Sequence, residues 1–255
     1  MIKNFQNCLW IFLLLSLGGC RCPSKELSSQ PAVHSAPVAQ LPAKSMMGVK
    51  HPIKDIKKPK LSKAALIVID AGHGGDDFGT RSLSQPKYHE KFLNLTTSLA
   101  LNEFLQKMGY RTRLTRSNDE FISLQKRANF ANDQGADLFV SVHYNSAPAK
   151  QADGIEIFYY KSEINKKRST QSSQLASSIL AQVIQATKAK SRGVKEGNFA
   201  VIRETKMPAV LIEGGFLTNE KEMNKIKEPA YIKRIAWGIA KGVEAYLNER
   251  AVSLP

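Results

Sequence analysis

The feature that most constrains this chain is the alternation of short apolar runs with longer segments whose apolar residues recur at helical spacing. Strand-like runs cover residues 64–70, 110–115, 137–143, 154–160, 199–202 and 209–212, and helix-like segments cover 92–108, 124–133, 172–188 and 232–247. Strands that alternate with helices predict a twisted, largely parallel sheet with helices on both faces. We therefore expect a single three-layer α/β domain over residues 64–255.

The N-terminus has the pattern of an export signal. Lys3 precedes an apolar run over residues 8–17, which is too short to span a bilayer as a mature helix and is typical of a secretory signal. The run ends in Leu17-Gly18-Gly19-Cys20, which resembles a bacterial lipobox. We expect residues 1–19 to be a lipoprotein signal peptide and Cys20 to carry the lipid, in an exported, membrane-anchored protein that faces the periplasm. An ordinary signal peptide with a chance cysteine is the alternative.

Cysteine usage limits the chemistry of the folded part. Cys8 leaves with the signal, Cys22 has no partner, and no cysteine follows Cys22. The folded domain therefore has neither a disulfide nor a thiolate metal ligand.

Residues 20–63 form a segment of different composition. They are rich in Pro, Ser, Ala and Lys and lack periodicity, which predicts a disordered tether. Residues 21–63 hold nine basic and two acidic residues, so the tether suits an anionic surface such as lipid head groups or a cell-wall polymer. A solvated linker that binds nothing is the plain alternative. Nucleic acid is disfavoured as a partner because the segment lacks interleaved aromatic residues and a docking motif.

Candidate functional residues stand where the predicted elements begin or end. His73 lies in the glycine-rich turn after the first strand, His143 ends a buried strand, Glu213 follows an apolar run, and Glu90 begins a helical segment. In open α/β folds, ligands bind at the carboxyl ends of the strands, so these side chains are expected to converge. Two imidazoles, one carboxylate and a spare carboxylate suit a hydrolytic zinc centre with an open position.

Each of these residues also has a plainer interpretation. Either histidine can be a turn or core residue without a ligand, and Glu90 can be a carboxylate favoured by the helix dipole. The pair His89-Glu90 looks like the start of the helical H-E-x-x-H motif, but Leu93 stands at the last position, so that protease class is disfavoured. Glu213 is costly at the end of so apolar a run unless it has a partner or a task.

Together these runs make the chain similar to a known family. The sequence resembles the zinc-dependent N-acetylmuramoyl-L-alanine amidases of the amidase_3 type. The matches recur in family order across nearly the whole predicted domain. The matching runs are Ile67-Val68-Ile69-Asp70-x-Gly72-His73-Gly74-Gly75, Glu90-Lys91-x-x-Asn94-Leu95, Leu114-Thr115-Arg116, Arg127-x-x-x-Ala131-Asn132, Ala136-Asp137-Leu138-Phe139-Val140-Ser141-x-His143-x-Asn145, Gly154-Ile155-Glu156 and Met207-Pro208-Ala209-Val210-Leu211-x-Glu213-x-Gly215-Phe216-Leu217-Thr218-Asn219.

The resemblance implies a mixed sheet of about six strands and a set of roles. It implies that His73, Glu90 and His143 bind Zn²⁺ and that Glu213 is the catalytic carboxylate. The implied substrate is peptidoglycan, and the implied scissile bond is the amide between the lactyl group of N-acetylmuramic acid and the L-alanine of the stem peptide. Zinc chemistry and a glutamate that first accepts and then donates a proton agree with hydrolysis of an amide.

Two further residues and two departures complete the comparison with the family. Asn145 and Arg127 are candidates to orient substrate or the metal ligands, with purely structural roles as the alternative. Ala71 stands where the family usually has proline, and Gly214 stands where it usually has an apolar residue. Neither departure removes a ligand.

The sequence also gives expectations about regulation and partners. Some division-associated relatives insert a blocking helix after the strand that matches residues 154–160. Here only about ten residues, 161–170, separate that strand from the next helix, so we predict no autoinhibitory helix. We expect a monomer that works with cell-division or wall-remodelling proteins.

Two rival functions remain open. One is a zinc peptidase of carboxypeptidase type that cuts within the stem peptide, and the other is a non-catalytic lipoprotein that binds the cell wall.

Overall fold

The computed structural model describes residues 65–252. The predicted signal peptide (1–19), Cys20 and the tether up to residue 63 lie outside the described residues. The strands are β1 (Leu66–Ala71), β2 (Arg111–Leu114), β3 (Leu138–Asn145), β4 (Ile155–Tyr159), β5 (Ser191–Glu196) and β6 (Ala209–Phe216). The helices are α1 (Glu90–Lys107), α2 (Leu124–Asp133), α3 (Lys166–Thr187), α4 (Ala200–Arg203), α5 (Glu220–Ile226) and α6 (Pro229–Val252).

The six strands form one mixed sheet in the order β2-β1-β3-β6-β4-β5. The pairs β1/β2, β1/β3 and β3/β6 are parallel, β4 runs antiparallel to β6, and β5 is parallel to β4. The carboxyl ends of β1, β3 and β6 therefore meet the amino ends of β4 and β5 at one edge of the sheet. This edge is where the candidate residues converge.

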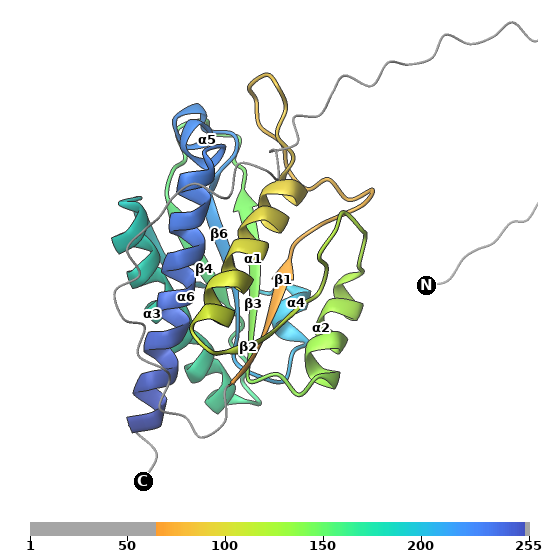
Figure 1. The fold of residues 1–255 in the computed structure, drawn as a ribbon, viewed down its shortest axis with the longest axis vertical. Helices are drawn as coiled ribbons and strands as arrows, with labels where there is room; N and C mark the ends of the chain where they lie inside the picture. Colours follow the sequence, from red (N-terminus) through yellow and green to blue (C-terminus); the bar gives the residue numbers. More distant parts are fainter. Residues whose placement is uncertain (1–64, 253–255) are drawn as a thin grey trace, which may run out of the picture. The chain divides into compact units, whose positions relative to one another are not determined.

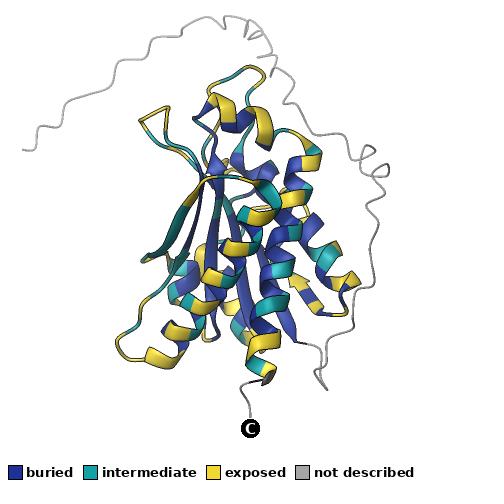
Figure 2. Cartoon of the chain, turned by 90° about the vertical axis from the view of Figure 1, so that its left-hand side faces the viewer, coloured by how far each residue is buried: buried dark blue, intermediate teal, exposed yellow. Residues whose placement is uncertain are grey.

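Helices cover both faces of the sheet, as predicted (Figure 1). One core cluster joins β1, β3, β4 and β6 to α1, α3 and α6, and a smaller cluster on the opposite face includes side chains of α2 and α4. The central strands are dark and buried between helices whose outer faces are exposed, whereas the edge strand β5 is only partly buried (Figure 2). In β1 every residue is buried, Asp70 included, because both faces of this strand are covered.

The structure corrects one predicted element and adds two. The run over residues 199–202, predicted as a strand, is the short helix α4, with Val201 and Ile202 packed in the smaller core cluster. A four-residue apolar run has no periodicity that separates a strand from a buried helical turn. Sequence reasoning missed β5 because this edge strand is half-exposed and basic, and it missed α5, which is capped by Asn219.

Two further observations concern the predictions on regulation and anchoring. The connection between β4 and α3 covers only residues 160–165 and holds no helix. Among residues 65–252, no helix is long and apolar enough to cross a membrane.

Candidate active site

The three predicted metal ligands lie together at the carboxyl edge of the sheet. Donor atoms of His73, Glu90 and His143 all lie within 4.8 Å of one another, and this arrangement could hold a metal ion. His73 Nε2 lies 3.1 Å from Glu90 Oε2, and His143 Nδ1 lies 2.9 Å from Glu90 Oε1. The two imidazole rings meet edge to face with centroids 5.0 Å apart.

The glycine-rich turn after β1 gives His73 its position. His73 has a left-handed backbone, with φ of 60°, which is strained for a residue with a side chain. Its Nδ1 lies 2.8 Å from Asp77 Oδ2, so a carboxylate fixes the ring and leaves Nε2 toward Glu90. Gly72 is required for a different reason: a Cβ there would lie 2.1 Å from His143 Cε1. The turn therefore brings both imidazoles into one site.

Glu90 is the first residue of α1 and is buried. Its Oε2 accepts the backbone N–H of Thr80, and its Oε1 accepts Asn94 Nδ2. Burial alone would raise the pKa of Glu90, but its hydrogen bonds to His143 and His73 hold that pKa far below its usual range. Glu90 is therefore an ionised carboxylate between two imidazoles, and its place at the helix N-terminus adds to this preference.

Glu213 lies in β6 between two neighbouring strands. Its partner in the register with β3 is His143, and its partner in the antiparallel register with β4 is Glu156. The Oε2 atom is buried and has no hydrogen-bond partner. Burial is the main cause that raises the pKa of Glu213 well above its usual value, and the carboxylates of Glu90 and Glu156 raise it further. An unpaired buried carboxyl oxygen is costly, and such a group beside a cluster of metal-type ligands is suited to proton transfer.

Arg127, a predicted site residue, is buried and forms hydrogen bonds to the end of β1 and to the turn that follows it. Its Nη1 donates to Asp70 Oδ1 at 2.9 Å and to the Ala71 carbonyl at 2.5 Å. Its Nη2 donates to the His73 carbonyl at 2.7 Å, and its Nε donates to the Ile122 carbonyl. These contacts favour a role in positioning the glycine-rich turn that carries His73 over direct contact with substrate.

A second buried arginine and a buried lysine hold the same turn. Arg116 donates to the carbonyls of Ala71 and Gly72. Lys91 Nζ donates to the Gly75 carbonyl and forms an ion pair with Asp119 at 2.7 Å. The turn is therefore fixed by donors on α1, on α2 and after β2.

Asn145, the other predicted site residue, belongs to a separate polar cluster. Its Nδ2 donates to Glu156 Oε1 at 2.7 Å, and its Oδ1 accepts the backbone N–H of Ser146. Glu156 Oε2 in turn accepts from Arg192 and Lys195. Asn145 thus lies beside the carboxylate that opposes Glu213 across the sheet.

This geometry agrees with comparisons to known proteins. The family model for N-acetylmuramoyl-L-alanine amidases, Amidase_3, matches residues 67–245. The chain belongs to the Amidase_3 family. It is therefore an enzyme, an N-acetylmuramoyl-L-alanine amidase that acts on peptidoglycan, as the sequence predicted.

Individual relatives support this placement of the amidase. This chain is 38% identical over 189 residues to the sporulation-specific N-acetylmuramoyl-L-alanine amidase of Bacillus subtilis (strain 168). The match covers 73% of this chain and 70% of the relative. The amidase structure from Clostridium difficile 630 aligns with a TM-score of 0.69 and 38% identity, over 74% of this chain and 100% of that one. The catalytic domain of CwlV from Bacillus (Paenibacillus) polymyxa aligns with a TM-score of 0.67 and 37% identity, over 72% and 98%.

Sequence reasoning missed several residues that support the site of the amidase. Asp77 follows His73 by four positions in a turn, which was the available signal. Lys91 and Glu156 belong to runs that match the family, but the match assigns them no role. Nothing in the sequence around Arg192 and Lys195 indicated that they lie near the site, because β5 was not predicted. His89, set aside on sequence grounds, is not part of the ligand group found within residues 65–252.

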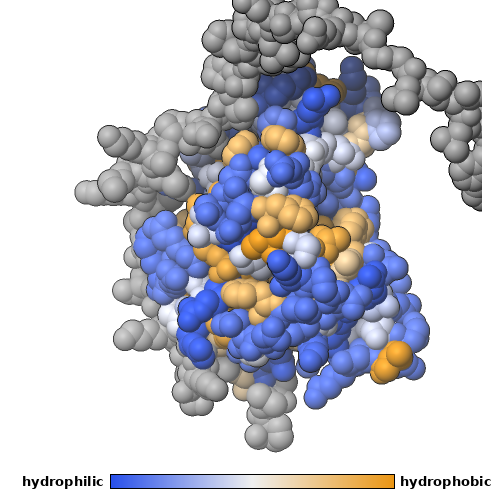
Figure 3. Space-filling view, turned by 90° about the vertical axis from the view of Figure 1, so that its right-hand side faces the viewer, coloured by the Kyte–Doolittle hydropathy of each residue, from blue (hydrophilic) through white to orange (hydrophobic). Residues whose placement is uncertain are grey.

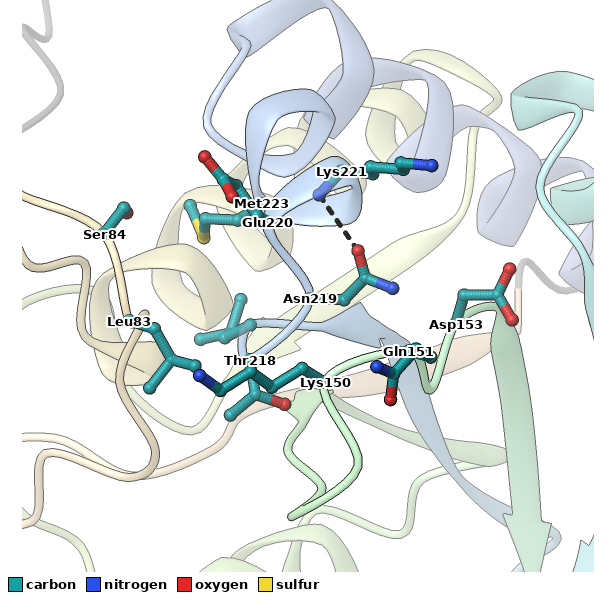
Figure 4. A pocket seen from close by; sticks show the side chains of 11 residues that line it. Leu83, Ser84, Lys150, Gln151, Asp153, Thr218, Asn219, Glu220, Lys221 and Met223 are labelled. Carbon is teal, nitrogen blue, oxygen red and sulfur yellow. Dashed lines mark hydrogen bonds between the residues drawn. The ribbon is translucent and has the colours of Figure 1, made fainter.

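Two further features lie at the surface of the domain. A pocket of about 580 Å³ lies beyond the ends of β3 and β6 (Figure 4). Its lining residues are Leu83, Ser84, Lys150, Gln151, Asp153, Leu217, Thr218, Asn219, Glu220, Lys221 and Met223. On the side where α2 lies, apolar surface gathers near the centre and is bordered by hydrophilic surface (Figure 3). Two large exposed apolar residues, Phe121 and Leu124, lie where α2 begins.

Proposed function

We propose that this amidase is a zinc hydrolase that cleaves the amide between N-acetylmuramic acid and the L-alanine of the stem peptide with Glu213 as general base. The observation that carries the proposal is that Glu213 Oε2 is buried without a hydrogen-bond partner. Glu213 pairs with His143 on the neighbouring strand β3. A role in proton exchange with the reacting groups accounts for a carboxyl group that is buried there without a partner.

The donor set fits zinc. His73, Glu90 and His143 supply two imidazoles and one carboxylate, a ligand set found in catalytic zinc sites that keep one position open. Among residues 65–252 there is no cysteine, which disfavours a closed thiolate site. When bound, zinc lowers the pKa of water and polarises a carbonyl group.

The protein's own residues would perform the proton transfers and the positioning. The Glu213 carboxylate accepts the proton of the attacking water and later donates it to the leaving amine of L-alanine, as base and then acid. Asp77 fixes the His73 ring through Nδ1, and Arg127 holds the backbone of the turn through the His73 carbonyl. These contacts hold the reacting groups in place before substrate arrives, which lowers the reorganisation needed during reaction.

The cellular setting is part of the same proposal. The signal-like residues 1–19, the lipobox-like Cys20 and the basic tether support an exported lipoprotein that faces the periplasm and reaches the cell wall. We assign it to wall remodelling and division. Cys20→Ser should release the protein from the membrane fraction and abolish labelling with a fatty-acid analogue, and unchanged labelling of this variant would contradict the anchor.

Mass spectrometry of digested peptidoglycan tests the reaction. Intact stem peptides released from the sugar, with loss of release on chelation and recovery on adding zinc, support the proposal. Shortened stems still attached to the sugar would make the protein a stem-peptide peptidase. Binding to peptidoglycan without any product would make it a wall-binding protein.

A further inference from the structure

A second charged cluster lies beside Glu213 and is not explained by the zinc reaction. Glu156 is 4% exposed and opposes Glu213 in the antiparallel register of β4 and β6. Its Oε2 accepts from Arg192 Nε at 2.8 Å and from Lys195 Nζ at 2.5 Å. One buried carboxylate is therefore paired with two cations on the neighbouring strand.

An irregularity in β5 puts both cations on one face. Arg192 and Lys195 are three positions apart, and in a regular strand such residues point to opposite faces. The register with β4 shifts between Ile155 and Ile157, which pair with Ser191 and Val194, so β5 holds one extra residue. Bulges of this kind re-aim side chains and are frequent beside active sites. Here the shift lets both cations reach Glu156.

The two cations are also accessible. The Arg192 side chain is 29% exposed and that of Lys195 is 39% exposed, against 5% for Glu156. The Arg192 guanidinium lies over the Phe216 ring at 4.9 Å, and Phe216 ends the strand that carries Glu213. The guanidinium is therefore held in one place, with part of its surface open to a ligand.

The substrate chemistry indicates what would bind there. In an N-acetylmuramoyl-L-alanyl peptide, the carboxyl group of muramic acid is consumed in the scissile amide. Free carboxylates therefore belong to the peptide beyond that bond. A peptide whose first amide lies at Glu213 and that extends over β4 toward β5 brings such a carboxylate to the two cations.

We propose that Arg192 and Lys195 form a subsite that binds a carboxylate of the stem peptide and so sets the peptide specificity of the enzyme. This inference rests on the proposed amidase reaction. Arginine and lysine bind a carboxylate through charge-assisted hydrogen bonds. The buried Glu156 carboxylate orients both side chains through its ion pairs with them. Arg192 and Lys195 are substrate-binding residues here, and neither takes part in proton transfer.

Two synthetic substrates test the subsite. Both are muramoyl-L-alanyl peptides, and they differ only in whether the peptide carboxyl groups are free or amidated. We expect the parent enzyme to prefer the free carboxylate by about tenfold in kcat/KM, the scale of one charge-assisted hydrogen bond at a half-exposed site. This preference should shrink as salt rises. Lys195→Gln and Arg192→Gln should each lower it, mainly through KM for the carboxylate substrate.

Matched variants separate binding from folding. Lys195→Arg keeps the charge and should keep the preference. Lys161→Gln removes a lysine from an exposed ion pair with Glu196, the last residue of β5. It should leave kcat/KM for both substrates unchanged. Thermal unfolding of each variant reports whether the domain is intact.

The outcomes distinguish this inference from the amidase proposal. Equal cleavage of both substrates by the parent, or an unchanged preference in both glutamine variants, would overturn the subsite while leaving the amidase intact. If the parent cleaves neither substrate, the amidase reaction fails, and the subsite is then judged by calorimetric binding of the free and amidated peptides. Equal affinity of the parent for those two peptides would overturn it.

Discussion

Replacing Arg127 by methionine should destabilise the domain, because Arg127 holds the turn that carries His73. Arg127 is 2% exposed and pairs with Asp70, which is fully buried. Methionine fills much of the same volume but donates no hydrogen bond. The variant leaves Asp70 without its cation and leaves the carbonyls of Ala71, His73 and Ile122 without this donor.

The expected loss can be estimated from that geometry. Removing one partner of a buried ion pair costs about 3–5 kcal/mol, because the remaining charge is uncompensated. For a domain of this size, 1 kcal/mol shifts the melting temperature by about 2–4 °C, so the midpoint should fall by about 10 °C. Urea unfolding monitored by circular dichroism measures the free energy directly.

The pH dependence gives the same prediction a second readout. Burial would raise the pKa of Asp70, but Arg127 and Thr115 more than offset this and hold that pKa below its usual value of 3.8. Asp70 therefore contributes stability that is fully present above pH 3.8 or so and is lost as pH falls through the lower folded-state pKa. The stability gap between parent and Arg127→Met should narrow in acid, because protonation removes the unpaired charge from the variant.

Arg203→Met is the matched control. Arg203 pairs with Glu204 at a site where both side chains are more than a third exposed, so its loss should cost less than about 1 kcal/mol. The reasoning is refuted if Arg127→Met costs no more than Arg203→Met, or if the gap between Arg127→Met and the parent does not change with pH.

Three further predictions follow from the contacts of the site. Gly72→Ala should displace the His143 ring, since the added Cβ would lie 2.1 Å from it; zinc content by mass spectrometry should fall, and full zinc loading would contradict the close approach. Asp77→Asn should lower zinc affinity by about 10–100-fold, the usual effect of a partner behind a ligand, measured by competition with a chelator, where unchanged affinity argues against that role. Tyr144→Phe removes a hydroxyl that bonds Thr97 in the core. Thr97 keeps its bond to the Leu93 carbonyl, so urea unfolding should show a loss of about 0.5–1.5 kcal/mol; a neutral effect would mean that the bond between the two hydroxyls adds nothing to stability.

The central strands and helices were predictable because their signals are local. The runs that became β1, β3 and β6 are apolar and end in glycine, histidine or glutamate, and the helix over residues 124–133 has the bounds expected. The strand β5 was not predictable, because Ser191–Glu196 has no apolar alternation and its pairing with β4 decides its conformation. The predicted strand at 199–202 was wrong, because this segment pairs with no strand and instead packs Val201 and Ile202 into the smaller core cluster as a helical turn.

The site was predictable as a set of residues but not as a structure. Ligand-type side chains at element boundaries, together with the family resemblance, predicted His73, Glu90, His143 and Glu213. The supports come from distant segments: Arg127 reaches the His73 carbonyl across 54 positions of sequence, and no local pattern encodes such a contact. The resemblance also gave no hint that two cations pair with Glu156, since only the register of the neighbouring strands brings Arg192 and Lys195 there.

The most direct test of the central claim compares Glu213→Gln with the parent on purified peptidoglycan while zinc content is measured on the same samples. Glutamine keeps the shape of the side chain but cannot accept the water proton. The account predicts equal zinc content, an unchanged fold, and a loss of about 10²–10⁴-fold in the release of intact stem peptides. Release by Glu213→Gln within a few-fold of the parent, at equal zinc content, would contradict it.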